Sequence, residues 1–186
     1  GFGGMVNWER RNPGQDARRR DNCGNGDASE GMNITLQPDE VQVCQMIGRM
    51  RSLIARGNGV RDAKMGDQDG SEADVMGFMA EYGFAKKMNC FPDLGLTPRS
   101  GSADGKMKSG KRYDVKSSDL RKARLLSTKK VNPDVDIYVL CVVNGNTLDF
   151  KGWAKKEDLI KEENEIDLGH GPGYALDQDK LRKFDA

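Results

Sequence analysis

Apolar residues recur at helical spacing in two stretches of the chain. In the first stretch, Pro38 suits the first turn of a helix and is followed by an apolar stripe. In the second, residues 71–74 have the capping-box pattern that marks a helix start. The stripe positions are Val43, Ile47, Met50 and Ile54 in the first stretch and Ala73, Met76, Gly77, Ala80, Phe84 and Met88 in the second. Two helices are therefore predicted, one from about residue 38 and one over about residues 71–88.

The second half of the chain carries strand patterns. Residues 136–143 are almost continuously apolar and rich in β-branched and aromatic side chains, which is typical of a strand buried on both faces. Asn144-Gly145 is a strong turn signal, and residues 147–150 can form a returning strand. Together with the segment around residue 114, these strands predict an α/β fold with at least three strands behind a capped helix.

Residues 112–116 read as a strand with two chemically different faces. Successive side chains of a strand point to opposite faces. Asp114 and Lys116 therefore share one face, while Tyr113 and Val115 share the other. The strand is predicted to present a polar face to solvent or ligand and an apolar face to the core.

A hairpin is predicted to lead into this strand. Residues 108–110 can form a three-residue loop, with Gly110 at the position that needs a positive φ. That register places Asp104 directly opposite Asp114, with Cβ atoms roughly 5 Å apart. A two-residue loop would move Asp104 to the wrong face, because a slip of one residue inverts every side chain.

Two facing carboxylates repel each other unless a positive charge lies between them. A hard divalent cation with oxygen ligands would fill that role, and Mg²⁺ typically takes one or two protein carboxylates and keeps several waters. Lys116 could orient an attacking water or stabilise charge on a phosphate. Glu81 lies next to the stripe of the second helix and can reach the edge of the sheet. The alternative is a surface hairpin whose acids and lysines are only solvated.

A formal net charge of +1 hides a strongly basic centre. Residues 86–130 hold 13 Lys and Arg against 4 Asp and Glu, a local charge of +9. Positive side chains beside an acidic site are what non-specific contact with a nucleic-acid backbone needs, whereas an isolated charge run is more often a solvated face. The candidate contacts are Lys86, Lys106, Lys108, Arg112, Ser117, Arg121, Lys122 and Arg124.

The charged pattern is similar to that of a known family. Glu81 in the second helix, Asp104 after Ala103, and the segment 113–117 resemble the PD-(D/E)xK nuclease superfamily, particularly its small phage and prophage members. The resemblance covers about residues 35–185 and departs from the name motif in having Ala103 where a proline would stand. It implies a restriction-endonuclease-like α/β fold, with a central mixed sheet of about four strands flanked by helices.

The resemblance also implies roles for individual residues. Asp104 and Asp114 would be metal ligands, with the backbone carbonyl of Val115 as a third and Glu81 as an accessory acid and possible ligand. Lys116 would be the catalytic lysine, and Ser117 would help to position the phosphate or end the strand. The implied cofactor is Mg²⁺, with Mn²⁺ as a substitute.

The resulting expectation is a divalent-metal-dependent nuclease that hydrolyses DNA phosphodiester bonds, an endonuclease of phage type. Two alternatives stay open. One is a non-catalytic nucleic-acid-binding protein on the same fold, and the other is a nuclease for RNA or branched junctions. A homodimer is a further possibility, since cutting both strands usually requires two active centres.

Length and composition predict the domain organisation and argue against a zinc site and a membrane span. The 186 residues suit one domain, at 34–186, after a flexible or extension segment at 1–33. The four cysteines show no C-x-x-C spacing and no histidine at zinc spacing, so no zinc is expected. No apolar stretch approaches the eighteen or so residues of a membrane span. The expected location is the cytoplasm, that of the host cell if the protein is phage-encoded.

Overall fold

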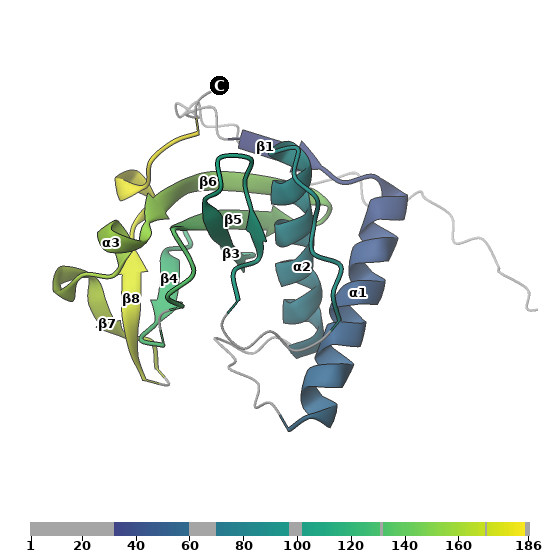
Figure 1. Ribbon diagram of the computed structural model, residues 1–186, viewed down its shortest axis with the longest axis horizontal. Coiled ribbons are helices and arrows are strands. Elements are labelled where there is room, and N and C mark those ends of the chain that lie inside the picture. The colour runs from purple at the N-terminus through teal and green to yellow at the C-terminus, as the bar shows by residue number, and fades with distance from the viewer. Residues whose placement is uncertain (1–31, 60–69, 97–101, 131, 170, 185–186) are drawn as a thin grey trace, which may run out of the picture.

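The chain folds into stacked layers of helix and sheet. A computed structural model describes residues 32–59, 70–96, 102–130, 132–169 and 171–184. The predicted N-terminal segment up to residue 31 and most of the loop between the two helices lie outside the described residues. Two long helices, a five-stranded mixed sheet and a smaller three-stranded sheet follow one another across the molecule (Figure 1). The α/β class predicted from the sequence is therefore confirmed.

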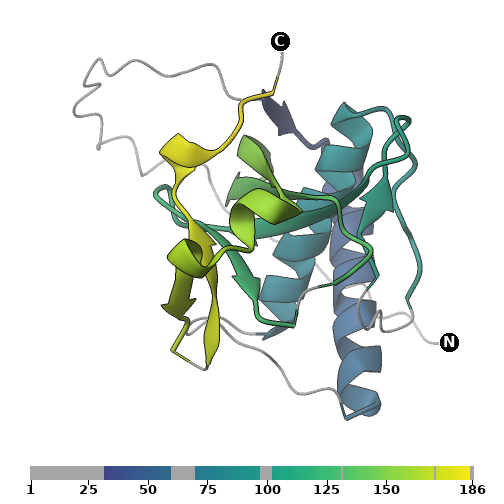
Figure 2. The ribbon, with the colours of Figure 1, turned by 60° about the vertical axis from the view of Figure 1, so that its left-hand side comes forward.

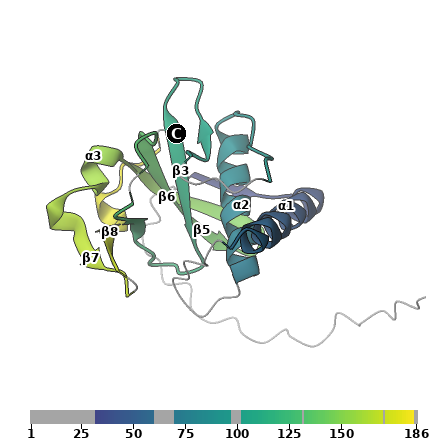
Figure 3. The same ribbon diagram turned by 60° about the horizontal axis from the view of Figure 1, so that its bottom comes forward.

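Two long helices form the outer layers on one side. They are α1 (Pro38–Gly57) and α2 (Gly70–Lys87), close to the predicted bounds. Helix α2 lies between α1 and the five-stranded sheet (Figure 3). Within the described part of the chain, neither helix nor any other is long and apolar enough to span a bilayer.

Helix α1 contacts α2 through small side chains and not through the whole predicted stripe. Its buried residues are Cys44, Gly48 and Ser52, whereas Val43 and Met50 are exposed. A Cβ atom at Gly48 would lie 2.6 Å from the Cα of Val75. The two helix backbones therefore approach too closely for larger side chains, which explains why the predicted stripe is wrong at these two positions.

The main sheet has five strands in the order β1-β6-β5-β3-β2. These strands are β1 (Met32–Thr35), β2 (Gly105–Lys106), β3 (Arg112–Ser118), β5 (Ile137–Asn144) and β6 (Thr147–Lys155). Strands β3 and β5 are parallel, and the other neighbours are antiparallel. The sheet exceeds the expected four or so strands because β1 pairs along the outer edge of β6.

A second sheet covers the face of β5 that points away from the helices. It is formed by β4 (Leu125–Thr128), β7 (Glu165–Asp167) and β8 (Pro172–Leu176), and it was not predicted. A short helix, α3 (Lys156–Leu159), and 3-10 turns at Glu162–Asn164 and Gln178–Lys180 complete this side. The C-terminal segment then runs back to the main sheet (Figure 2), where Arg182 pairs with Trp153. Strand β5 is therefore buried on both faces, as predicted.

The hairpin formed by β2 and β3 has the predicted register as far as Gly105, where the pairing ends. Lys106 pairs with Arg112 and Gly105 with Tyr113, and the amide of Met107 donates to the carbonyl of Lys111 at 2.8 Å. Gly110 has a φ of +88° in the connecting turn, as a three-residue loop requires. The alternation of β3 follows from this pairing.

Candidate functional site

Strand β3 separates its side chains as its alternation predicted. Tyr113 and Val115 are buried in the core that α2 covers. On the other face, the Nζ of Lys116 lies 2.8 Å from Oδ1 and 3.0 Å from Oδ2 of Asp114. The ammonium group thus sits between both oxygens of the carboxylate, and the side chain of Asp114 is only 17% exposed.

Asp104 reaches β3 in a different way from the one predicted. The ladder ends at Gly105, and the amide of Asp104 also donates to the carbonyl of Tyr113, at 2.9 Å. Asp104 and Gly105 therefore both face Tyr113, which is the two-against-one arrangement of a β-bulge. The directly opposed Asp104–Asp114 pair is not formed. Instead, Oδ2 of Asp104 accepts a hydrogen bond of 2.7 Å from the amide of Val115.

This hydrogen bond locates a stretch of open backbone on β3. The amide and carbonyl of one strand residue point to the same neighbour. Because the amide of Val115 points to Asp104 and not to β5, its carbonyl lies along the same edge. Strand β2 covers that edge only through Gly105 and Lys106. The Val115 carbonyl predicted as a metal ligand therefore faces the Asp104 side of the strand.

Glu81 brings a third carboxylate to this edge from α2. Its side chain is 19% exposed, and its Oε2 lies 2.9 Å from a guanidinium nitrogen of Arg51. Burial raises the pKa of Asp104, and the charges of Glu81 and Asp114 raise it further. The amide of Val115 and the charge of Lys116 act in the opposite direction but are weaker, so the pKa of Asp104 stays well above its usual value.

Lys116 is held in its charged form. Burial alone lowers the pKa of Lys116. The charge and hydrogen bond of Asp114, together with the charge of Asp104, outweigh that effect and raise the pKa above its usual value. At neutral pH this side chain is an ammonium group, suited to stabilising negative charge and not to accepting a proton.

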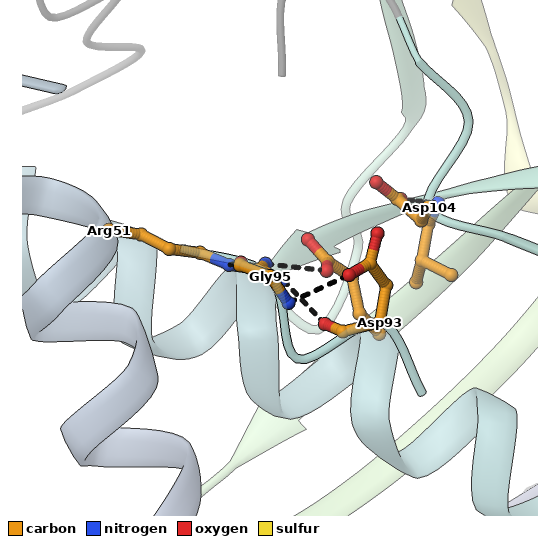
Figure 4. Close-up of polar contacts among 6 residues, drawn as sticks. Arg51, Asp93, Gly95 and Asp104 are labelled. Atoms are coloured by element: carbon orange, nitrogen blue, oxygen red, sulfur yellow. Dashed lines mark hydrogen bonds and ion pairs between the residues drawn. The ribbon is translucent and has the colours of Figure 1, made fainter. Parts of the chain in front are cut away.

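Arg51 is a component of the site that the sequence reasoning missed. From α1 its guanidinium donates to the carbonyl of Asp93 at 2.6 Å and to that of Gly95 at 2.9 Å, besides pairing with Glu81. The group also stacks 4.4 Å from the ring centre of Phe78. Figure 4 shows Arg51 extending from its helix to these loop residues, with Asp104 beyond them. Arg51 thus joins both helices to the loop beside the carboxylates. The sequence signal was weak: a single arginine adjoining the small-residue face of α1.

The predicted nucleic-acid contacts fall into two groups. Three of them form ion pairs within the fold: Lys86 with Glu40, Arg112 with Asp134, and Arg124 with Asp177. The other four predicted lysines and arginines are exposed and have no ion-pair partner in the described part of the chain: Lys106 and Lys108 in the hairpin, and Arg121 and Lys122 after β3. These four flank the carboxylates at the two ends of the strand.

Ser117 lies on the opposite face from Lys116. A Cβ atom at Gly77 of α2 would lie 3.9 Å from the hydroxyl oxygen of Ser117. Strand β3 continues to Ser118, so Ser117 does not end it. The hydroxyl therefore faces the helix that carries Glu81, and not the side occupied by the Asp114–Lys116 pair.

The donor chemistry of this cluster fits a hard divalent cation. Asp104, Asp114, Glu81 and the carbonyl of Val115 offer only oxygen atoms, which Mg²⁺ and Mn²⁺ prefer. The pKa of Asp104 is raised first by burial and then by the charges of Glu81 and Asp114, and a bound cation would offset those charges. As they stand, the described residues contain no group of three or more His, Cys, Asp or Glu side chains arranged to hold a metal ion.

The Arg51 contacts predict a large effect on stability. Arg51→Met keeps an apolar stem over Phe78 but leaves Glu81 without the guanidinium charge and two backbone carbonyls without their donor. Urea denaturation should show a free energy of unfolding lower by about 2–3 kcal/mol. The control is Arg56→Met, which removes an exposed guanidinium bonded within its own helix. Equal losses in the two variants would contradict the role given to Arg51.

The crowding of carboxylates predicts that Asp104→Asn stabilises the fold at neutral pH. An asparagine retains an oxygen to accept the Val115 hydrogen bond but carries no charge. Because the pKa of Asp104 is raised by folding, its protonated form favours the folded state. That stability is present below the unfolded pKa of about 4 and is lost as pH rises through the folded pKa.

Thermal unfolding at two pH values measures this effect. The Tm of Asp104→Asn should exceed that of the wild type by a few degrees at pH 7, since 1 kcal/mol corresponds to roughly 2–4 °C at this size. The difference should shrink near pH 4. Asp149→Asn serves as the control, because Asp149 belongs to an ion pair with Lys151 on β6. A lower Tm for Asp104→Asn at pH 7 would rule out carboxylate repulsion as the dominant effect.

The chain was compared with protein-family models, curated proteins and solved structures. No protein-family model, curated protein or solved structure matches the chain. What the site can do is therefore inferred from its own residues.

Proposed function

We propose that the protein is a divalent-metal-dependent nuclease of the PD-(D/E)xK superfamily, with a restriction-endonuclease-like fold, which hydrolyses DNA phosphodiester bonds as an endonuclease of phage type. One observation carries the proposal. Carboxylates from three separate parts of the fold lie close together: the charges of Glu81 and Asp114 both raise the pKa of Asp104, and the ammonium group of Lys116 pairs with Asp114. Its place of action would be the cytoplasm, the host's if the gene belongs to a phage.

The position of the cluster supports this reaction class. A phosphodiester needs a positive site for its non-bridging oxygens and room for an in-line water. Strand β3 offers an open edge at Val115, with two carboxylates and a lysine side chain next to it. Arg51 of α1 joins Glu81 to the loop at Gly95, beside these carboxylates.

Each residue of the cluster would have a separate role in the reaction. Asp104, Asp114 and the Val115 carbonyl would hold Mg²⁺ or Mn²⁺, with Glu81 as an accessory acid. When bound, such an ion supplies Lewis-acid stabilisation and lowers the pKa of a water. The Lys116 ammonium would stabilise the negative charge that the phosphate gains. A water oxygen would bond to phosphorus and lose a proton to solvent, the bond between phosphorus and the departing oxygen would break, and solvent would protonate that oxygen.

Cleavage assays test the proposal, and a second Asp-x-Lys ion pair elsewhere in the fold provides the control. Supercoiled DNA should be nicked or linearised with Mg²⁺ or Mn²⁺ but not with EDTA. Asp114→Asn and Lys116→Met should each lower the rate by at least about 100-fold, a typical loss for one electrostatic group in an active site. Asp149 and Lys151 form a second Asp-x-Lys ion pair on β6. Asp149→Asn and Lys151→Met should therefore retain full activity.

Other outcomes would assign the chain to the alternatives. DNA that is bound but never cut, with Asp114→Asn behaving as the wild type, indicates a non-catalytic binding protein. Cleavage restricted to RNA or branched junctions keeps the catalytic residues and changes the substrate. Cutting that survives both EDTA and Lys116→Met contradicts the proposal. A readout without catalysis is the Tm, which Mg²⁺ should raise for the wild type more than for Asp104→Asn.

The unpaired basic side chains predict the salt dependence of DNA binding. Replacing Lys106, Lys108, Arg121 and Lys122 by glutamine should weaken binding to all sequences alike. The slope of log K against log salt should fall by up to about 0.9 per lost phosphate contact. The control replaces Lys86 and Arg124, which are engaged by Glu40 and Asp177. An unchanged slope in the fourfold variant would exclude these residues from the DNA contact.

A further inference from the structure

Helix α1 has a second apolar face that no element of the described chain covers. The outer stripe consists of Val43, Met46, Met50 and Leu53, which are 43%, 68%, 44% and 64% exposed. The stripe lies opposite Cys44, Gly48 and Ser52, the residues buried against α2. In Figure 3, α1 is the outermost layer, with α2 between it and the sheet. Four large apolar side chains thus point away from the fold.

The spacing of the outer stripe is that of a helix–helix seam. Its residues are separated by three, four and three positions, the a/d spacing with which two helices pack their side chains together. Scattered exposed apolar residues are ordinary, but a contiguous row on one helix marks an interaction surface.

We propose that the outer stripe is the interface of a homodimer in which two α1 helices pack antiparallel. A twofold axis beside residues 46–50 brings Val43 opposite Leu53 of the second copy and Met46 opposite Met50. The same four side chains then complete both halves of the contact, as an isologous interface requires. The inference does not rest on the proposed nuclease activity.

Charges at the two ends of the stripe favour this direction. Asp39 lies four residues before Val43, in the first turn of α1. Arg56 lies three residues after Leu53, in the last turn, where its exposed guanidinium also donates to the carbonyl of Ser52. Antiparallel packing brings the acidic start of each helix to the basic end of the other, whereas parallel packing would bring like charges together. The helix dipoles also oppose each other in the antiparallel pair. Arg49, exposed beside the middle of the stripe, lies near Arg49 of the second copy, and salt weakens this repulsion as it weakens the attraction at the ends.

Sedimentation equilibrium on the full chain tests the interface. The mass should rise from the monomer value of 20.6 kDa towards twice that value as concentration increases. Met46→Glu combined with Leu53→Glu should give a monomer with an unchanged circular dichroism spectrum. Leu120→Glu is the control: it places a charge on a residue that is 67% exposed outside α1, and the dimer should persist.

A charge exchange tests the direction of packing. Asp39→Arg alone and Arg56→Asp alone should each raise the dissociation constant about tenfold, and the two together should restore it, because both copies then carry exchanged ends. A full chain that stays monomeric overturns the proposal, whatever else covers the stripe. A dimer that persists when Met46→Glu and Leu53→Glu are combined would show that the interface lies elsewhere. If the combined Asp39→Arg and Arg56→Asp exchange does not restore the dissociation constant, the antiparallel arrangement is wrong.

Discussion

The parallel pairing of β3 with β5 is the constraint on which the rest of the molecule depends. Each residue from Tyr113 to Ser118 has a fixed partner from Ile137 to Val142. Strand β5 is buried on both faces, and a slip of β3 by one residue would turn Asp114 and Lys116 into the core in place of Tyr113 and Val115. The alternation of β3 is therefore fixed as well. This is why Tyr113 and Val115 enter the core while Asp114 and Lys116 stay on the other face.

The same pairing leaves the opposite edge of β3 largely open, and the acids collect there. Strand β2 covers only two residues of that edge, and the bulge at Asp104 turns its carboxylate to the amide of Val115. Burial, followed by the charges of Glu81 and Asp114, raises the pKa of Asp104. The cations Arg51, paired with Glu81, and Lys116, paired with Asp114, offset only part of the carboxylate charge. A local loss of folding stability of this kind is common at functional sites, where activity and stability compete.

The inner and outer faces of helix α1 differ in the size of their side chains. Its inner face is built from small residues, so its backbone approaches α2 closely enough for Arg51 to reach Glu81 and the loop at Asp93. With the small residues on the inside, four large apolar side chains, Val43, Met46, Met50 and Leu53, are left on the outside. The close helix contact and the exposed stripe are thus two consequences of one orientation of α1.

The sequence by itself determined the local structure, because short-range rules decide it. The positive φ of Gly110, the register of the hairpin, the two faces of β3 and the burial of β5 follow from loop length and alternation. Only the tertiary structure decided which face of α1 points inward, because small and large apolar residues satisfy the helical period equally well. It also decided the bulge at Asp104, the partnership of Arg51 and the second sheet. These features join residues far apart in the chain, and no local pattern specifies which distant partner each side chain meets.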